Sequence, residues 1–380
     1  MPLSEVRKKI DDIDSELIKL LEDRFKLSKE VADIKRNENI PVLNNSREND
    51  ILDKIDLVAE NYAPFVKAVY ATLFDTSRSL QHVLLSGESE FADYFDTLSE
   101  NKQCFDPTGK KIACFGVEGS YSNIAARKLF KENEFVFAET FEKVFELVKN
   151  DTVSCGVVPI ENSTAGSINE NYDLLRKYGL KIIMAGDLPI HHCLLAKKGT
   201  SVSDIKTVYS HPQAISQCQD FIEKNGFKAI PQDSTSACAE MVASSEDTSF
   251  AAIASEEAAE EYGLEIISRN IQSNNKNTTR FVAVTKEVFI SDDADKISIM
   301  FTLPHRTGSL YKTLMKFAFN GLNLTKIESR PISGQDFEYY FYLDFKGNIS
   351  NENTRSVLNE IGSEANDFTF LGNYKECSFN

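Results

Sequence analysis

The sequence predicts a multidomain chain: an all-α segment at the N-terminus, an α/β segment after it, and an α+β unit of the ferredoxin-like order at the C-terminus. Apolar residues recur at helical spacing up to residue 85, and short apolar runs alternate with helical stretches over 111–287. The order strand, helix, strand, strand, helix, strand fills residues 295–376. A length of 380 residues also exceeds what one compact core usually holds.

Residues 1–85 form the helical segment. From Val6 to Lys35 there is no Pro or Gly, and apolar residues follow a 4-3 spacing that predicts a long helix with one buried seam. A second helix is predicted from a cap at Ser46 to about Glu60, after Pro41 ends the connection, and a third from Phe65 to Leu84. The seam comprises Val6, Ile10, Ile13, Leu17, Leu20, Leu27, Val31 and Ile34.

Residues 86–110 lose the helical period and carry six acidic against two basic residues, so we interpret them as a linker. The α/β segment that follows is long enough to form two lobes with a cleft between them. Its strand candidates are IACFGV, VSCGVVPI, LKIIMAGDL, CLLAKK, TVYS, FKAIPQ, FAAIAS and TRFVAVT, and its helix candidates are 122–131, 211–225, 235–245 and 255–262.

Composition excludes several classes of protein. The net charge of −16 repels phosphate backbones and anionic lipid, which argues against nucleic-acid and membrane-surface roles. No apolar run reaches the roughly 20 residues of a membrane helix, and the N-terminus lacks a signal-peptide core, so we expect a cytoplasmic protein. The seven cysteines form no CxxC pair. The five histidines lack metal-ligand spacing, and the adjacent His191 and His192 resemble a strand edge, so we expect no metal.

One cation interrupts the apolar seam. The spacing of Leu17, Leu20 and Leu27 places Arg24 where an apolar residue belongs, and a buried guanidinium needs an anionic partner. An ion pair with a neighbouring helix would explain Arg24 alone. Lys35, however, lies about 16 Å along the helix on nearly the same face, so both side chains can reach one small anionic ligand.

The position of Arg7 adds a constraint. Arg7 lies about 26 Å from Arg24 and about 42 Å from Lys35 along the helix, too far to share one small ligand within a chain. If Arg7 serves the same kind of site, it must come from a second subunit. Ser77 and Gln81 lie one turn apart on the third helix and offer neutral hydrogen bonds.

Residues 3–85 resemble the all-helical chorismate mutase domain of bacterial bifunctional P-proteins. The resemblance rests on VRKKIDDIDSELIKLLEDRFKLSKEVADIK, on Pro41, on Ser46-Arg47-Glu48 and on the Ser77/Gln81 pair. It implies an interlaced homodimer and a [3,3] rearrangement of chorismate to prephenate, which requires positioning and electrostatic stabilisation but no nucleophile. It implies an active site made of Arg7, Arg24, Lys35, Arg47, Glu48, Ser77 and Gln81, with Asn44 contacting the substrate.

Polar corners recur at strand ends in the α/β segment, for example where GVVPIENSTAGSI leaves a buried-type strand. A carboxylate, an amide and a helix N-terminus can hold an anion and handle a proton, although an ordinary βα turn has the same composition. FGVEGSYSNIAAR lacks the GxGxxG pattern, which disfavours a dinucleotide cofactor. We expect no cofactor.

Residues 111–285 resemble prephenate dehydratase, whose two-lobed fold is similar to periplasmic binding proteins. The motifs are GVEGSYSNIAA, GVVPIENSTAGSI, YSHPQAISQC, STSACA, AAIASEEAAEEYGL and NKNTTRF. The implied reaction is loss of CO2 and the ring hydroxyl from prephenate, with the proton donor left open between Thr279 and Glu161. The implied catalytic residues are Glu161, Asn162, Ser210, Gln217 and Thr279, and the implied substrate-binding residues are Ser122, Asn123, Ser163, Thr164, Ser234, Thr235 and Arg280.

The C-terminal unit resembles the ACT domain fused to these dehydratases, through ISIMFTLPHRTGSLYKTL and LTKIESRPI. The resemblance implies L-phenylalanine as an effector bound at a subunit interface; a domain used only for dimerisation is the simpler alternative. The implied effector-binding residues are Gly308, Ser309, Leu310, Glu328, Ser329, Arg330 and Pro331.

The leading interpretation is therefore a bifunctional enzyme of phenylalanine biosynthesis. Two alternatives stay open at this point. One is a ligand-sensing protein that keeps the lobes and the effector domain without turnover, and the other is a dehydratase whose helical segment serves only dimerisation. The sequence leaves open the oligomeric state beyond a dimer, channelling between sites, and preference for prephenate or arogenate.

Overall fold

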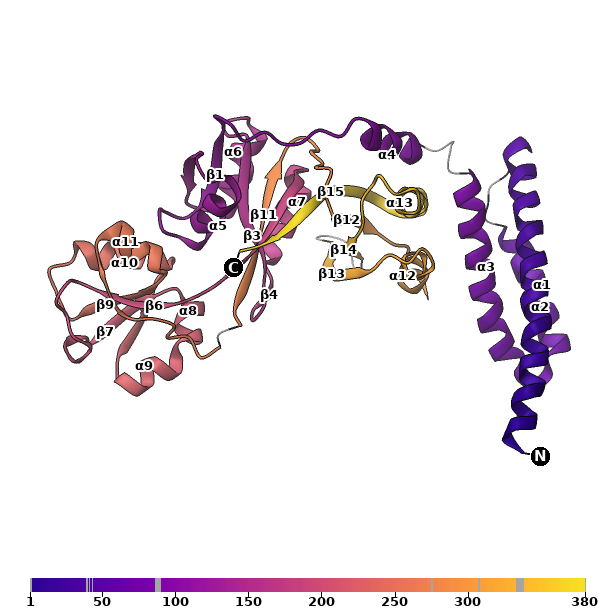
Figure 1. Cartoon of the computed structure of the whole chain (residues 1–380), viewed down its shortest axis with the longest axis horizontal. Coiled ribbons are helices and arrows are strands. Elements are labelled where there is room, and N and C mark those ends of the chain that lie inside the picture. The colour runs from indigo at the N-terminus through magenta and orange to yellow at the C-terminus, as the bar shows by residue number, and fades with distance from the viewer. Residues whose placement is uncertain are drawn as a thin grey trace.

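The computed structural model describes residues 2–379 except 39, 41, 43, 86–89, 275, 307 and 333–337. A helical bundle lies at one end of an elongated molecule, a two-lobed α/β body at the other, and the C-terminal domain between them (Figure 1). Pro41 and residues 86–89, which we assigned to connections, lie outside the described residues. Within the described ranges no helix is both long and apolar enough to cross a membrane.

The three predicted helices of the bundle are confirmed. They are α1 (Leu3–Glu38), α2 (Asn45–Val58) and α3 (Ala63–Leu85), with a 3-10 turn at Glu60–Tyr62. The predicted cap of the second helix is wrong by two residues. Asn44 Oδ1 accepts the backbone N–H of Arg47 at 3.1 Å, so Asn44 is the N-cap and Ser46 lies inside the helix.

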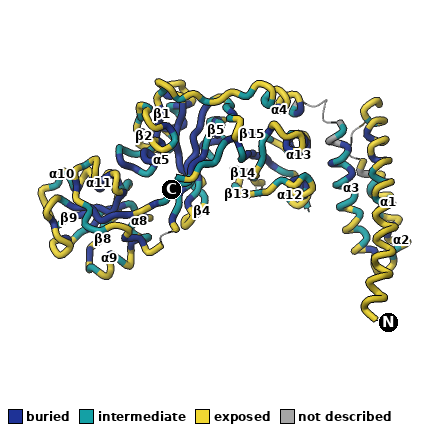
Figure 2. Tube along the Cα trace, viewed as in Figure 1, coloured by how far each residue is buried: buried dark blue, intermediate teal, exposed yellow. Residues whose placement is uncertain are grey.

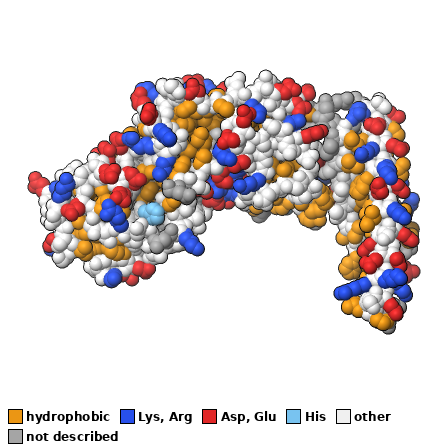
Figure 3. All heavy atoms as spheres, in the orientation of Figure 1, with side chains coloured by type: hydrophobic (Ala, Val, Ile, Leu, Met, Phe, Trp, Pro, Cys, Tyr) orange, Lys and Arg blue, Asp and Glu red, His pale blue; other side chains and the backbone are white. Residues whose placement is uncertain are grey.

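The predicted seam of α1 is not buried within one chain. Leu20 is 67% exposed and Leu27 59%, and the buried residues of α1 are Ser28 and Ala32. Figure 2 shows α1 exposed along most of its length, and Figure 3 shows apolar side chains at the surface of the bundle. The seam is therefore an open apolar face, because α1 has α3 as its main partner within the chain.

The prediction that residues 86–110 lose the helical period is wrong for α4 (Glu90–Glu100). Phe91, Phe95 and Leu98 follow an i, i+4, i+7 spacing that the acidic composition obscured. Phe95 is fully buried and makes an edge-to-face contact with Phe370 at 5.4 Å between ring centroids. Helix α4 thus packs against the C-terminal domain.

The α/β body has two lobes, and the chain crosses between them after β5 and before β11. The first lobe contains β1 (Lys111–Phe115), α5 (Tyr121–Phe130), β2 (Glu134–Ala138), α6 (Phe141–Lys149), β3 (Cys155–Asn162), β4 (Gly166–Ser167), α7 (Asn169–Tyr178), β5 (Lys181–Pro189) and β11 (Thr278–Thr285). The second contains β6 (Cys193–Ala196), a 3-10 turn (Val202–Asp204), β7 (Thr207–Ser210), α8 (Pro212–Gln217), α9 (Gln219–Asn225), β8 (Lys228–Pro231), α10 (Thr235–Ser244), β9 (Phe250–Ala254), α11 (Glu256–Tyr262) and β10 (Glu265–Ser268).

Most predicted elements of the body are confirmed, with two differences. The helix expected over 211–225 is divided at Cys218, whose N–H bonds to the carbonyls of Ala214 and Ile215 and closes α8 with a tight last turn. The elements β2, β4, α6 and β10 were not among the predictions. The second lobe has its own sheet, in the order β10-β6-β9-β7-β8.

The predicted order of the C-terminal unit is confirmed. Its elements are β12 (Lys296–Thr302), α12 (Ser309–Phe319), β13 (Leu324–Pro331), β14 (Tyr339–Lys346), α13 (Glu352–Glu364) and β15 (Asn366–Ser378). Its sheet is continuous with that of the first lobe, in the order β13-β14-β12-β15-β5-β11-β3-β1-β2. Strand β15 pairs with β12 up to Tyr374 and with β5 from Lys375 to Ser378. Just before this change of partner, a Cβ at Gly372 would lie 2.0 Å from the carbonyl oxygen of Ile182 in β5.

Two interfaces join the C-terminal domain to the rest of the chain. Tyr374 and Leu371 belong to the apolar core of the first lobe, together with Val158. On the other side, Ser79 of α3 donates to Glu360 of α13 at 2.9 Å. The C-terminal domain is therefore packed against both the lobe and the bundle.

Candidate active sites

Two cations of the bundle, Arg24 and Lys35, hydrogen-bond to neutral partners. Arg24 Nη1 donates to Ser77 Oγ across α1 and α3, and Lys35 Nζ donates to the carbonyl oxygen of Val42 at 2.5 Å. Among the described residues neither cation has a carboxylate within salt-bridge distance. Burial lowers the pKa of both groups, and the nearby charge of Glu48 opposes that shift. The alternative in which Arg24 forms an ion pair with a carboxylate of a neighbouring helix is therefore wrong for the described residues, since Arg24 donates to Ser77 instead.

Glu48 has a partner that the sequence did not suggest. Its carboxylate pairs with Arg78 of α3, which also pairs with Asp75. All three side chains are at most about a quarter exposed (24% for Glu48, 13% for Arg78 and Asp75). Arg78 adds positive charge beside the predicted site, and no spacing rule distinguished it from an ordinary surface arginine.

The remaining predicted residues of the bundle differ in their surroundings. Gln81 is buried, its Nε2 donates to the carbonyl of Ser77 at 3.2 Å, and within the described part of the chain its Oε1 has no partner. Arg47 is exposed. Arg7 is exposed near the N-terminal end of α1, about 26 Å along the helix from Arg24. Asn44 is exposed, and its Oδ1 caps α2.

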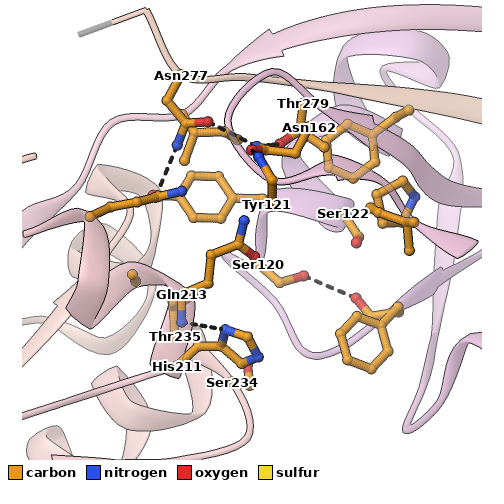
Figure 4. A pocket seen from close by; sticks show the side chains of 18 of the residues that line it. Ser120, Tyr121, Ser122, Asn162, His211, Gln213, Ser234, Thr235, Asn277 and Thr279 are labelled. Carbon is orange, nitrogen blue, oxygen red and sulfur yellow. Dashed lines mark hydrogen bonds between the residues drawn. The ribbon is translucent and has the colours of Figure 1, made fainter. Parts of the chain in front are cut away.

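A cleft of about 310 Å³ lies between the two lobes (Figure 4). Apolar side chains from the first lobe, such as Phe115, Phe141 and Phe281, form part of its wall. The predicted residues that line it are Ser122, Asn162, Gln217, Ser234, Thr235 and Thr279.

A chain of amides holds the Thr279 hydroxyl. Asn162 Nδ2 donates to Thr279 Oγ1 and to Asn277 Oδ1, each at 2.8 Å. Asn277 Nδ2 then donates to Gln217 Oε1 at 3.0 Å, and Gln217 Nε2 donates to Thr164 Oγ1 at 3.2 Å. Because the Thr279 oxygen accepts from Asn162, its own O–H proton can be directed into the cleft.

The interpretation of His191 and His192 as a mere strand edge is wrong for His192. Its ring lines the cleft, with Nε2 2.8 Å from Gln217 Oε1 and Nδ1 3.0 Å from the Tyr121 hydroxyl. Burial lowers the pKa of His192, so the ring is neutral near pH 7. His192 and Asn277 lie on the two crossings between the lobes, and this placement, invisible to periodicity, is why the prediction missed them.

Glu161 and Arg280 do not face the cleft, which corrects their predicted roles as catalytic and substrate-binding residues. In the register of β11 and β3, Thr279 pairs with Asn162 and Arg280 with Glu161. Since successive side chains of a strand point to opposite faces, the second pair lies behind the first. Glu161 Oε1 is 2.8 Å from Lys326 Nζ, and Arg280 Nη2 is 2.9 Å from Glu376 Oε1, both in the C-terminal domain.

Three other predicted residues have structural partners outside the lining of the cleft. Ser210 is fully buried and donates to the carbonyl of Ile253 at 2.6 Å. Ser163 Oγ donates to the carbonyl of Lys276 at 3.1 Å. Asn123 is buried and accepts the backbone N–H of Gly119 at 3.3 Å. These residues shape the loops that carry the lining rather than forming it.

The described lining of the cleft contains no Lys or Arg. Its titratable side chains are Tyr121, His192, His211 and Asp233. An anionic ligand there would therefore be held by hydroxyls, amides and backbone N–H groups.

The predicted effector residues lie on α12 and β13. Gly308 has φ +84° and caps α12, which begins with Ser309 and Leu310. On β13 the side chains alternate: Glu328 accepts from Ser167 of the first lobe at 2.6 Å and Arg330 donates to Asp173 at 2.9 Å. Ser329 and Pro331, in contrast, are exposed. Strand β13 is also the edge of its sheet.

Comparison with known proteins gives two family matches. The model for chorismate mutase type II matches residues 6–82, and the model for prephenate dehydratase matches residues 112–288. The bundle with its unpaired cations and the two-lobed cleft thus belong to a mutase joined to a dehydratase.

Full-length relatives have the same two activities in one chain. The bifunctional chorismate mutase/prephenate dehydratase of Escherichia coli K12 is 32% identical over 383 residues, covering 98% of this chain and 96% of that one. The Aquifex aeolicus protein of the same name is 33% identical over 380 residues, covering 99% and 98%. A prephenate dehydratase from Arthrobacter aurescens, solved in complex with L-Phe, matches with TM-score 0.65 and 27% identity over 70% of this chain and 89% of that one.

The chain belongs to the bifunctional chorismate mutase/prephenate dehydratase family. It is an enzyme of L-phenylalanine biosynthesis that converts chorismate to prephenate and prephenate to phenylpyruvate.

Proposed function

We propose that the cation cluster of the bundle is the mutase site and that the cleft beside Thr279 is the dehydratase site. Residues 1–85 then form the mutase domain, 111–287 the dehydratase domain and 295–376 an ACT domain. The observation that carries this assignment is the pair of separate polar sites, one with unpaired cations and one without Lys or Arg in its described lining.

In the mutase site the protein holds chorismate in its reactive conformer and stabilises charge on the breaking ether oxygen. Arg24 and Arg47 bind carboxylates, and Lys35 and Gln81 address the ether oxygen. The Nε2 amide group of Gln81 has two N–H donors, of which one donates to the carbonyl of Ser77, so the second can donate to the ether oxygen. Arg78 holds Glu48 at the position from which it orients the ring hydroxyl.

A second copy of the chain completes the mutase site. The open apolar face of α1 supports this, because such a face is usually covered in solution. Arg7 lies on the same helix but far from Arg24, so it serves the site of the second copy across the interface.

Complementation between two inactive chains tests this arrangement. Arg7→Ala and Lys35→Ala should each abolish most mutase activity, while subunit exchange between them restores about a quarter of the wild-type rate, because half of the dimers are mixed and each has one intact site. Chorismate disappearance measures the recovery. As the control, mixing Lys35→Ala with Arg24→Ala should restore nothing, since both residues belong to the same half of the site. Failure of the first pair to recover would contradict the shared site.

In the dehydratase site the C–COO⁻ bond breaks, its electron pair enters the ring, and the ring hydroxyl leaves. Thr279 donates the hydrogen bond, and then the proton, that turns the departing hydroxyl into water, and its oxygen regains a proton from solvent before the next turnover. Glu161 is the less suitable donor because Lys326 and Arg280 bind it behind the sheet. Carbon dioxide leaves most readily when no cation holds the carboxylate, because its charge disperses in the transition state, and the described lining of the cleft contains none.

L-Phenylalanine inhibits the dehydratase through the C-terminal domain. The relative from Arthrobacter aurescens binds L-Phe, and the exposed Ser329 and Pro331 on the edge strand β13 are suited to a site between subunits. The inward residue Glu328 contacts Ser167, which lines the cleft. L-Phe bound at β13 can therefore influence the cleft through the hydrogen bond between Glu328 and Ser167.

Glu328→Ala should weaken inhibition by L-Phe at least ~10-fold while leaving uninhibited turnover within about 3-fold, because the effect acts through a coupling of typical size. Prephenate turnover at increasing L-Phe measures it. Glu352→Ala, at an exposed acidic residue of α13, is the control. Deleting the domain is a poorer test because β15 pairs with β5. Unchanged inhibition in Glu328→Ala would refute this route.

One assay tests the whole assignment. Purified chain given chorismate should form prephenate and then phenylpyruvate. A ligand-sensing protein would turn over neither compound, and a dehydratase with an inert bundle would use prephenate alone.

A further inference from the structure

His211 stands in the dehydratase cleft without an assigned role. It is the N-cap of α8 on the second lobe, across the cleft from Asn162 and Thr279 on the first. Figure 4 shows its ring among the lining side chains, with Nδ1 turned to the backbone N–H of Gln213. That N–H donates to Nδ1 at 3.2 Å.

The hydrogen bond fixes the tautomer of the ring. Because Nδ1 accepts a proton from Gln213, the proton of the neutral imidazole resides on Nε2. Burial lowers the pKa of His211, opposed only by the charge of Asp233, so the neutral form predominates near pH 7. Within the described part of the chain no acceptor lies within hydrogen-bond distance of Nε2. The ring thus presents a free N–H donor to the cleft.

Such a donor matters because the described lining has no Lys or Arg. The neighbouring hydroxyl of Ser234 is partly used, since it accepts the backbone N–H of Ala237 at 3.4 Å as the cap of α10. Prephenate carries two carboxylates, of which one leaves as CO2 and one stays on the product. A donor on the leaving carboxylate would stabilise the ground state and slow the reaction, whereas a donor on the retained one binds substrate and transition state alike.

We propose that His211 is a substrate-binding residue whose Nε2–H donates to the side-chain carboxylate that phenylpyruvate retains. This inference rests on the proposed dehydratase site. It assigns a specificity role to the second lobe: the first lobe supplies the proton donor, and the second recognises the part of the substrate that does not react.

Two substitutions separate binding from helix capping. His211→Asn keeps an acceptor at the position of Nδ1 and a good N-cap, but does not reach the position of Nε2. His211→Gln reaches that position with an amide N–H but loses the cap. We expect His211→Asn to raise KM for prephenate at least ~10-fold with kcat within about 3-fold, which is the pattern of lost uniform binding. His211→Gln should recover part of kcat/KM.

Product inhibition gives an independent readout. Phenylpyruvate keeps the carboxylate, so its inhibition constant should rise with KM in His211→Asn. Mutase turnover and Gln219→Ala, at the start of α9, serve as controls. A near-normal KM in His211→Asn, together with a lowered kcat/KM in His211→Gln, would show that His211 only caps α8. That result would overturn the inference. Failure of the proposed function itself would look different, because the wild-type chain would then not consume prephenate.

Discussion

Replacing Lys35 with alanine is expected to lower mutase turnover at least ~100-fold while the fold survives, because the ammonium group acts on charge that develops only in the transition state. Lys35 donates to a single protein acceptor, the carbonyl of Val42, and has no salt bridge within the described residues. Its removal therefore leaves no buried carboxylate unpaired. Chorismate consumption measures the loss, and circular dichroism measures the fold.

Lys29→Ala, at an exposed lysine of the same helix, is the matched control and should be near normal. The pH profile adds a second check. Burial lowers the pKa of Lys35 below its ordinary 10.5, and the charged form is the active one. Mutase activity should therefore fall as the pH rises through that lowered pKa, before an ordinary lysine would titrate. Near-normal turnover in Lys35→Ala would remove Lys35 from the mutase site.

Replacing Thr279 with valine should lower dehydratase turnover at least ~100-fold and leave the mutase rate unchanged. Valine keeps the shape of threonine but cannot accept from Asn162 or donate into the cleft. Asn162 Nδ2 retains its bond to Asn277, so the amide chain persists. This variant should convert chorismate to prephenate, which then accumulates. The accumulation can be followed by absorbance during turnover.

Thr278→Val changes the preceding residue of β11 and should keep normal dehydratase activity, because alternate side chains face opposite sides of the strand. Thr279→Ser restores the hydroxyl and should recover much of the rate. Loss of both activities in Thr279→Val would argue against separate sites, and normal dehydration would move the proton donor elsewhere in the cleft.

The misplacement of Glu161 shows what motif similarity leaves out. Glu161 and Asn162 are consecutive residues of a strand, so a period of two already implies that both cannot face the cleft. The structure decides which one does: Asn162 donates to Thr279, while Glu161 binds Lys326 of the C-terminal domain. The resemblance to the family identified the residues of the motif, but not which face of the strand each side chain lies on.

The contribution of the residues at the crossings between the lobes to the cleft could not be predicted, for a different reason. His192 and Asn277 contact Gln217 from positions 25 and 60 residues away along the chain. No local period connects such positions, because their proximity depends on how two separate sheets are placed. The free N–H of His211 likewise follows from a backbone hydrogen bond at Gln213, a contact that composition does not reveal.

The amino-acid sequence by itself determined the three segments, most helices and strands, and the cations that break the apolar seam of α1, since these depend on local spacing and side-chain chemistry. Tertiary structure alone decided that the seam stays open within one chain, that β15 joins the C-terminal sheet to β5, and which side of each strand meets the cleft. The physical reason is that burial and hydrogen-bond partners depend on residues distant along the chain, whose approach no local pattern encodes.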